Sequence, residues 1–225
     1  MTAFFAAAYE DRIELLTDGS VVRDDGTIAN LADKAWRCDT LPIAFAGRGN
    51  VGALIMTGPV TLGMLAACGT VDGTLAAFID ELETGLPRLR GAKIDGVICA
   101  ISEADGPGIY YFTTADTVAG FDPFVLYNVT PIHGCGSEPT EEAFAAYGFP
   151  ERLLTEPLSD CGADMFTVLR ATKMPHENAG GHLVYGVGGH ADLTTVTPEG
   201  ATTRRLHTWP EDQIGLPIDP IGSTQ

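Results

Sequence analysis

The sequence predicts an α+β fold, a four-layer αββα sandwich in which two β-sheets face each other and helices cover the outer faces. The expected elements run in the order strands, helix pair, strands, helix pair, strands. Two facing sheets with helices outside would bury the apolar side of every helix in one unit. The chain of 225 residues is 45% hydrophobic and contains no repeat or linker. We therefore expect one domain over 1–225, with an irregular tail after about residue 209.

The first 50 residues are expected to form a β-meander, because turn signals separate runs of strand-forming residues. Asp25-Gly26 is typical of a hairpin turn. The strands are predicted at 3–9, 12–18, 21–28, 34–38 and 42–46.

From Asn50 the pattern becomes helical, with a break expected at Gly58-Pro59 because proline interrupts the helical hydrogen-bond ladder. Thr70 is expected to cap a clearer amphipathic helix that ends near Thr84. No residue between Arg48 and Asp72 is charged. The glycines and the proline of this stretch favour a buried pair of helices over a membrane span.

The second half is expected to contain a strand hairpin, a further strand, two helices and three final strands. The hairpin turns at 105–108, and Ser159 or Asp160 is expected to cap the second helix. The predicted strands are 94–101, 109–114, 123–128, 182–187, 193–197 and 202–207, and the helices are 139–148 and 158–173.

The charge balance excludes some classes of partner. Thirteen basic and 30 acidic residues give a net charge of −17, so nucleic acid and anionic membranes are not expected partners. Five widely spread cysteines without a C-x-x-C pair indicate neither a disulfide framework nor a zinc site. The N-terminal residues lack the basic start of a signal peptide, so we expect a cytoplasmic protein.

Thr2 becomes the first residue of the chain when the initiator Met1 is removed. A threonine hydroxyl is a weak nucleophile, but at a chain start its own α-amino group can act as the base. The reference pKa of that amine, about 7.7–8.0, allows it to accept a proton near neutral pH. Thr2 is therefore a candidate nucleophile.

Asp18 and Lys34 follow Thr2 by sixteen and thirty-two residues, and Gly47 closes the next expected strand. With this spacing the N-terminal part resembles the proteasome β-subunit and HslV-like family of N-terminal nucleophile hydrolases. The resemblance implies that Thr2 attacks an amide, and that the charge of Lys34 lowers the pKa of the nucleophile and its amine. It also implies that Asp18 pairs with Lys34 and that the Gly47 N–H binds the oxyanion.

The same resemblance implies a peptide or amide substrate, a homo-oligomeric ring, no cofactor and no metal; any ATPase unfoldase partner is unknown. The residues expected to support the threonine amine are replaced in this chain, and the candidates in their place are Cys135, Ser137, Glu177 and Asn178. The residues implied near the substrate side chain are Val21, Ala32, Trp36 and Phe45, which indicate a neutral or apolar preference.

Other interpretations stay open beside the threonine peptidase. The altered supporting residues favour, as an alternative, an inactive ring-forming structural or assembly protein with the same fold. Residues 47–52 match G-x-G-x-x-G, with Asp72 downstream, which is the outline of a dinucleotide-binding oxidoreductase. A thiol nucleophile at His133-Gly134-Cys135, or zinc on the histidines at 176, 182 and 190, is less favoured than turn and surface roles.

Overall fold

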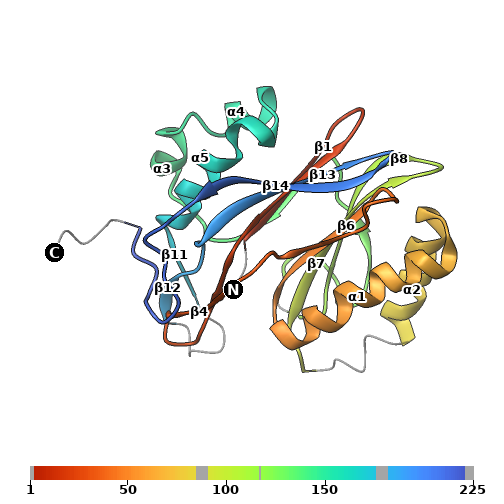
Figure 1. The fold of residues 1–225 in the computed structure, drawn as a ribbon, viewed down its shortest axis with the longest axis horizontal. Helices are drawn as coiled ribbons and strands as arrows, with labels where there is room; N and C mark the ends of the chain where they lie inside the picture. The colour runs from red at the N-terminus through yellow and green to blue at the C-terminus, as the bar shows by residue number, and fades with distance from the viewer. Residues whose placement is uncertain (1–2, 85–90, 117, 176–181, 221–225) are drawn as a thin grey trace.

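The computed structural model describes residues 3–84, 91–116, 118–175 and 182–220. Two five-stranded antiparallel sheets dominate the fold (Figure 1). The first sheet has the order β10 (Ile132–Cys135), β1 (Phe4–Ala8), β2 (Ile13–Asp18), β13 (His190–Thr197), β14 (Gly200–Thr208). The second has the order β5 (Ala35–Arg37), β6 (Ile43–Gly49), β7 (Ile94–Ser102), β8 (Gly106–Thr113), β9 (Tyr127–Asn128).

Two short sheets and five helices complete the described part of the chain, which is thus a mixed α+β structure. The short sheets pair β3 (Ser20–Val22) with β4 (Ile28–Leu31), and β11 (Lys173–Pro175) with β12 (Leu183–Tyr185). The helices are α1 (Val51–Cys68), α2 (Val71–Thr84), α3 (Glu141–Ala145), α4 (Glu151–Thr155) and α5 (Leu158–Arg170).

The expectation of one N-terminal meander is wrong. Strands β1 and β2 belong to the first large sheet, whereas β5 and β6 belong to the second. Between them β3 and β4 form a separate hairpin, and its turn uses Gly26 at φ 85°, as the Asp25-Gly26 signal predicts. The chain therefore crosses from one sheet to the other within its first 50 residues.

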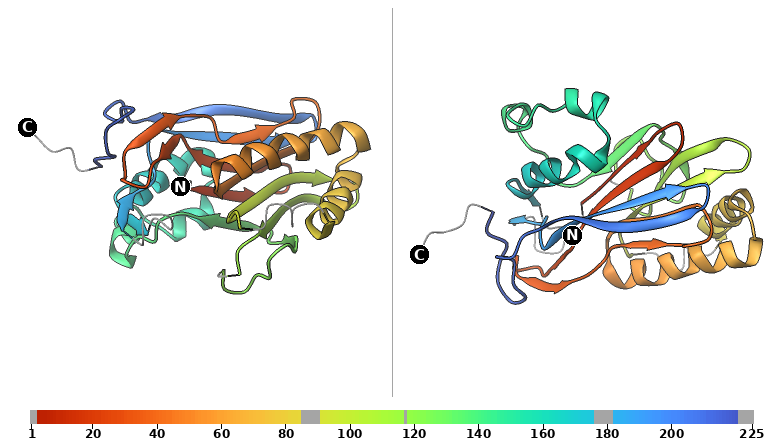
Figure 2. Two further views of the ribbon diagram at one scale, coloured as in Figure 1. Left: turned by 90° about the horizontal axis from the view of Figure 1, so that it is seen from below. Right: turned by 45° about the horizontal axis from the view of Figure 1, so that its top comes forward.

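Both large sheets are covered on both faces, because successive residues of one strand enter different apolar clusters. In β2, Leu16 packs with α5, and its neighbour Leu15 packs between the two sheets. In β6, Phe45 packs under α1 and α2, and Ala44 and Ala46 pack between the sheets. Figure 2 shows α1 and α2 on the side of the molecule away from α3, α4 and α5. This burial explains why every residue of β2 is buried although the strand includes charged side chains.

Helix α1 runs unbroken through the predicted break at Gly58-Pro59. Pro59 lies on an exposed part of the helix, where water can bind the carbonyl that its missing N–H leaves unpaired. Gly58 has a packing role instead, because a Cβ there would lie 2.4 Å from the indole of Trp36. By length and composition α1 meets the criteria for a membrane span, and 33% of that window is buried.

The start of α5 is capped from the first sheet and not by the expected Ser159 or Asp160 side chains. Pro157 occupies the cap position and makes no side-chain cap bond. The Leu158 N–H donates to the Tyr9 hydroxyl at 2.9 Å, and the Ser159 N–H donates to Glu14 Oε2 at 2.8 Å. A buried carboxylate at a helix N-terminus also complements the helix dipole.

Other predicted boundaries shift in the second half. Strand β9 occupies only the end of the predicted 123–128 run, and α5 stops before β11 begins at Lys173. The predicted helix 139–148 shortens to α3, and neither α4 nor β10 was expected. Strand β10 is short and rich in turn residues, so only its pairing with β1 identifies it.

Candidate active site

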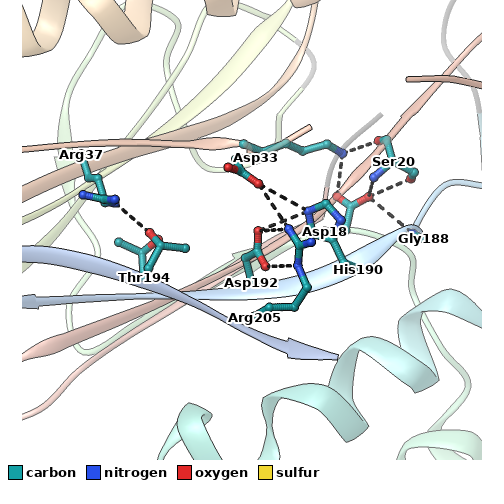
Figure 3. A network of polar contacts seen from close by, with 11 residues as sticks. Asp18, Ser20, Asp33, Arg37, Gly188, His190, Asp192, Thr194 and Arg205 are labelled. Atoms are coloured by element: carbon teal, nitrogen blue, oxygen red, sulfur yellow. Dashed lines mark hydrogen bonds and ion pairs between the residues drawn. The ribbon is translucent and has the colours of Figure 1, made fainter. Parts of the chain in front are cut away.

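Asp18 lies at the end of β2 and its buried carboxylate accepts hydrogen bonds from several segments (Figure 3). Oδ1 accepts from Lys34 Nζ at 2.8 Å and from the Ala3 N–H at 3.0 Å. Oδ2 accepts from the Ser20 N–H at 3.1 Å, the Ser20 hydroxyl at 2.9 Å and the Gly188 N–H at 3.4 Å. The charge of Asp18 is thus compensated without water.

Lys34 directly precedes β5, and its ammonium group reaches this cluster. It is buried, and it donates both to Asp18 and to the backbone carbonyl of Ser20. Burial lowers the pKa of Lys34, and the charge of Asp18 acts in the opposite direction. A buried lysine of this kind places a positive charge where water is excluded.

The contact with Ala3 ties the pair to the beginning of β1. The carboxylate of Asp18 accepts from the Ala3 N–H, and the Asp18 N–H donates to the Ala3 carbonyl at 3.3 Å. Ala3 is the residue that follows Thr2 in the sequence. Thr2 itself lies outside the described residues, as do Glu177 and Asn178.

Gly47 lies on β6 of the second sheet, next in register to Lys34. Ala35, the residue after Lys34, pairs with Ala46, the residue before Gly47. A Cβ at Gly47 would lie 2.6 Å from Leu54 Cδ2 and 2.7 Å from the carbonyl of Asp95. Packing between α1 and β7 is therefore sufficient to require glycine at this position.

Cys135 and Ser137 lie beside the start of β1 but engage other groups. Cys135 pairs with Phe4, and burial raises the pKa of its thiol to about 12, so the thiol stays protonated. The Ser137 hydroxyl donates to the Leu169 carbonyl at 2.6 Å, which ties this segment to α5. A Cβ at Gly136 would lie 3.1 Å from Ala3 Cβ, so the turn packs directly against residue 3.

A pocket of about 350 Å³ opens beside Lys34. Trp36, one of the four predicted substrate residues, lines it together with Thr17, Arg37 and Asp192. Phe45 is fully buried, and its ring lies tilted against Trp36 and stacked on Phe112.

The other two predicted substrate residues lie in the β3–β4 region, with Val21 inside β3 and Ala32 just after β4. Both are partly buried, and neither is among the residues that line the pocket. The pocket lining includes charged side chains of both signs and is more polar than the sequence indicated.

Sequence reasoning missed the residues that complete the Asp18 environment. Ser20 binds both Asp18 and Lys34, and Gly188 donates to Asp18 from the loop before β13. Burial raises the pKa of Asp192 on β13, but the nearby His190 and Arg205 lower it, and the net shift is downward. The Gly-Gly-His sequence at 188–190 was a visible signal, but nothing local indicated that it lies beside Asp18.

The structure contradicts the dinucleotide-binding alternative. That fingerprint requires a parallel βαβ unit, whereas β6 and β7, which flank α1 and α2, are antiparallel neighbours. Asn50 caps α1 through its side chain, which accepts from the Ala53 N–H, and Asp72 accepts from the Ala104 N–H. Burial raises the pKa of the Cys135 thiol, which disfavours the thiolate that a cysteine nucleophile needs.

No family model matches this chain, and no curated protein matches it. Among solved structures, a Gly-1 mutant of Anbu from Hyphomicrobium sp. strain MC1 superposes with a TM-score of 0.59 at 13% identity. The superposition covers 95% of this chain and 89% of that one. The chain has the fold of Anbu.

The assignment of this chain to the proteasome β-subunit and HslV-like family is therefore wrong. No family model and no curated relative shows that family for this chain. A likeness to Anbu at 13% identity shows a shared fold and no closer kinship.

Proposed function

We propose that this chain is a threonine-type amide hydrolase, with peptides as the favoured substrates and Thr2 as the nucleophile. The observation that supports it best is the buried Asp18–Lys34 pair, which is hydrogen-bonded to the backbone of the residue after Thr2. In this proposal the fold is the four-layer αββα sandwich, formed by one domain that works in the cytoplasm. A homo-oligomeric ring is part of the same proposal, and native mass spectrometry would test it.

The chemistry follows from the groups around Lys34. Thr2 Oγ attacks the amide carbon, its proton passes to the α-amino group, and that proton then goes to the leaving amine. Water hydrolyses the resulting acyl ester and releases the acid and Thr2. The charge of Lys34 favours the unprotonated amine at neutral pH, because a nearby cation lowers the pKa of an ammonium group. Gly47 is the proposed oxyanion donor.

Intact-mass measurement after exposure to a peptide epoxyketone or a β-lactone tests this function. We expect one adduct on Thr2 in the wild type and in Thr2→Ser, and none in Thr2→Ala. Lys34→Met should label much more slowly, whereas Lys93→Met, a change at an exposed lysine, should label at the wild-type rate. N-terminal sequencing comes first, since a retained Met1 excludes the mechanism.

The inactive assembly protein remains the second candidate, and one observation favours it. Ser137, which follows the glycine that packs against Ala3, uses its hydroxyl on the Leu169 carbonyl. A folded ring without any adduct under several probes would support this candidate and refute the hydrolase.

A further inference from the structure

Asp33, His190 and Asp192 bring three ligand atoms together beside the pocket (Figure 3). His190 Nε2 lies 3.2 Å from Asp192 Oδ2 and 3.8 Å from Asp33 Oδ1, and all three atoms lie within 4.8 Å of one another. His190 and Asp192 come from β13, and Asp33 comes from the segment between β4 and β5. The cluster therefore joins two parts of the chain that are far apart in sequence.

His190 provides the observation that points to a ligand. Its side chain is 7% exposed, yet its Nε2 has no hydrogen-bond partner within the ranges that the structure describes. Asp192 Oδ2 lies 3.2 Å from Nε2 and forms an ion pair with it when the imidazole is protonated, but the neutral ring has no hydrogen-bond partner at Nε2 within the described residues. An unpaired buried ring nitrogen is costly, and a metal ion is one group that can satisfy it.

The position of the imidazole is fixed by packing. A Cβ at Gly19 would lie 2.2 Å from His190 Cε1, so the ring rests directly on the backbone of Gly19. The ring therefore cannot turn toward that side, and Nε2 stays directed at the two carboxylates (Figure 3). A ligand atom held in place in this way loses little freedom when it binds an ion.

Arg205 occupies part of the same space. Its Nε donates to Asp192 Oδ1 at 2.9 Å, and its Nη2 lies 3.2 Å from Asp192 Oδ2 and 3.3 Å from Asp33 Oδ1. Nη2 thus faces the two oxygens that a cation would need. The Arg205 side chain is 46% exposed, so the whole guanidinium group can move outward into solvent when an ion binds. Two carboxylates beside one arginine also leave a net negative charge for a cation to neutralise.

We propose that Asp33, His190 and Asp192 form a binding site for a divalent transition-metal ion of the zinc class. One imidazole and two carboxylates are ligands that zinc accepts, with water in the fourth position. Bond lengths of about 2.0–2.2 Å place tetrahedral ligand atoms about 3.4 Å apart, close to the separations found here. Asp33 is 78% exposed and can close the longer distance by rotating its side chain. Asp33 and Asp192 both line the pocket beside Lys34, so the ion would face whatever binds there.

Titration with Co²⁺, followed by its visible absorption and by Zn²⁺ displacement, tests the site without reference to hydrolysis. We expect saturable binding of one ion in the wild type at micromolar concentration and loss of at least about tenfold in affinity in His190→Gln and Asp33→Asn. Arg205→Gln should tighten binding by about tenfold, because it removes the competing cation. His182→Gln is the matched control, since His182 is an exposed histidine outside the cluster.

Circular dichroism on each variant establishes that it is folded. Absence of Co²⁺ binding in the wild type would overturn the proposal, and so would binding that persists in His190→Gln. Thiolate charge-transfer absorption would also overturn it, because it would place the ion on a cysteine. A wild type that binds Co²⁺ without any Thr2 adduct would support the metal site and refute only the hydrolase.

Discussion

The hydrogen bonds around Asp18 predict that substituting Asp18 and substituting Lys34 lower the free energy of unfolding by unequal amounts. Lys34→Met leaves the Asp18 carboxylate with the N–H groups of Ala3, Ser20 and Gly188 and the hydroxyl of Ser20. Asp18→Asn removes the carboxylate that balances the positive charge of the buried Lys34. It also turns an amide NH₂ toward donors. The asparagine substitution should therefore be the more damaging one.

The expected magnitudes follow from what each substitution leaves buried. Removing the charge of one member of a buried ion pair costs about 3–5 kcal/mol, which we expect for Asp18→Asn. Lys34→Met leaves a satisfied carboxylate and an apolar side chain of similar length, so we expect a loss of about 1–2 kcal/mol. Urea unfolding followed by circular dichroism gives both values.

Glu156→Gln, which removes the partly exposed Arg152–Glu156 pair, is the control and should cost less than about 0.5 kcal/mol. Equal losses for the two buried variants, or a larger loss for Lys34→Met, would show that the backbone donors do not hold Asp18 as described.

Two further predictions concern other parts of the fold. Burial raises the pKa of Tyr9 from 10.0 to about 12, so its contribution to stability is complete below pH 10 and is lost as the pH rises toward 12. Tyr9→Phe should lower the free energy of unfolding at pH 7 by about 1 kcal/mol, because the Leu158 N–H loses its acceptor. The same substitution should make the loss of stability above pH 10 smaller. An unchanged dependence of stability on alkaline pH would argue against this role of Tyr9. Pro59→Ala restores a backbone donor inside α1 and should raise the free energy of unfolding by about 1–3 kcal/mol in urea titrations, whereas a decrease would show that the helix needs the proline.

Local signals in the sequence were sufficient for the elements that depend on neighbouring residues. The Asp25-Gly26 turn and the Thr70 cap of α2 both form, with Thr70 Oγ1 accepting from the Gly73 N–H at 3.1 Å. Helix α2 forms over Val71–Thr84, where the amphipathic pattern predicts a helix. These features are determined within a few residues of chain, so their chemistry is visible in the sequence.

The features that the sequence did not reveal depend on distant partners. The cap of α5 comes from Tyr9 and Glu14, which precede it by more than 140 residues. Strand β10 is defined by its pairing with β1, and the sheet to which β5 and β6 belong is defined by β7. The cluster of His190 with Asp33 requires the same long-range knowledge. No local pattern contains this information.

The Asp18–Lys34 pair combines both kinds of evidence, and it also bears on the choice between hydrolase and assembly protein. Its residues were selected by spacing from Thr2, and the structure joins them in an ion pair even though the family assignment that accompanied them is wrong. If the pair served only stability, apolar residues of similar size would serve as well, because replacing a buried ion pair in this way is often neutral or stabilising. A charge held against the backbone of residue 3 has a use that apolar residues cannot supply, which is to lower the pKa of a nearby amine. Unfolding measurements on Asp18 and Lys34 variants therefore report how the site is held together, whereas labelling of Thr2 alone reports what the site does.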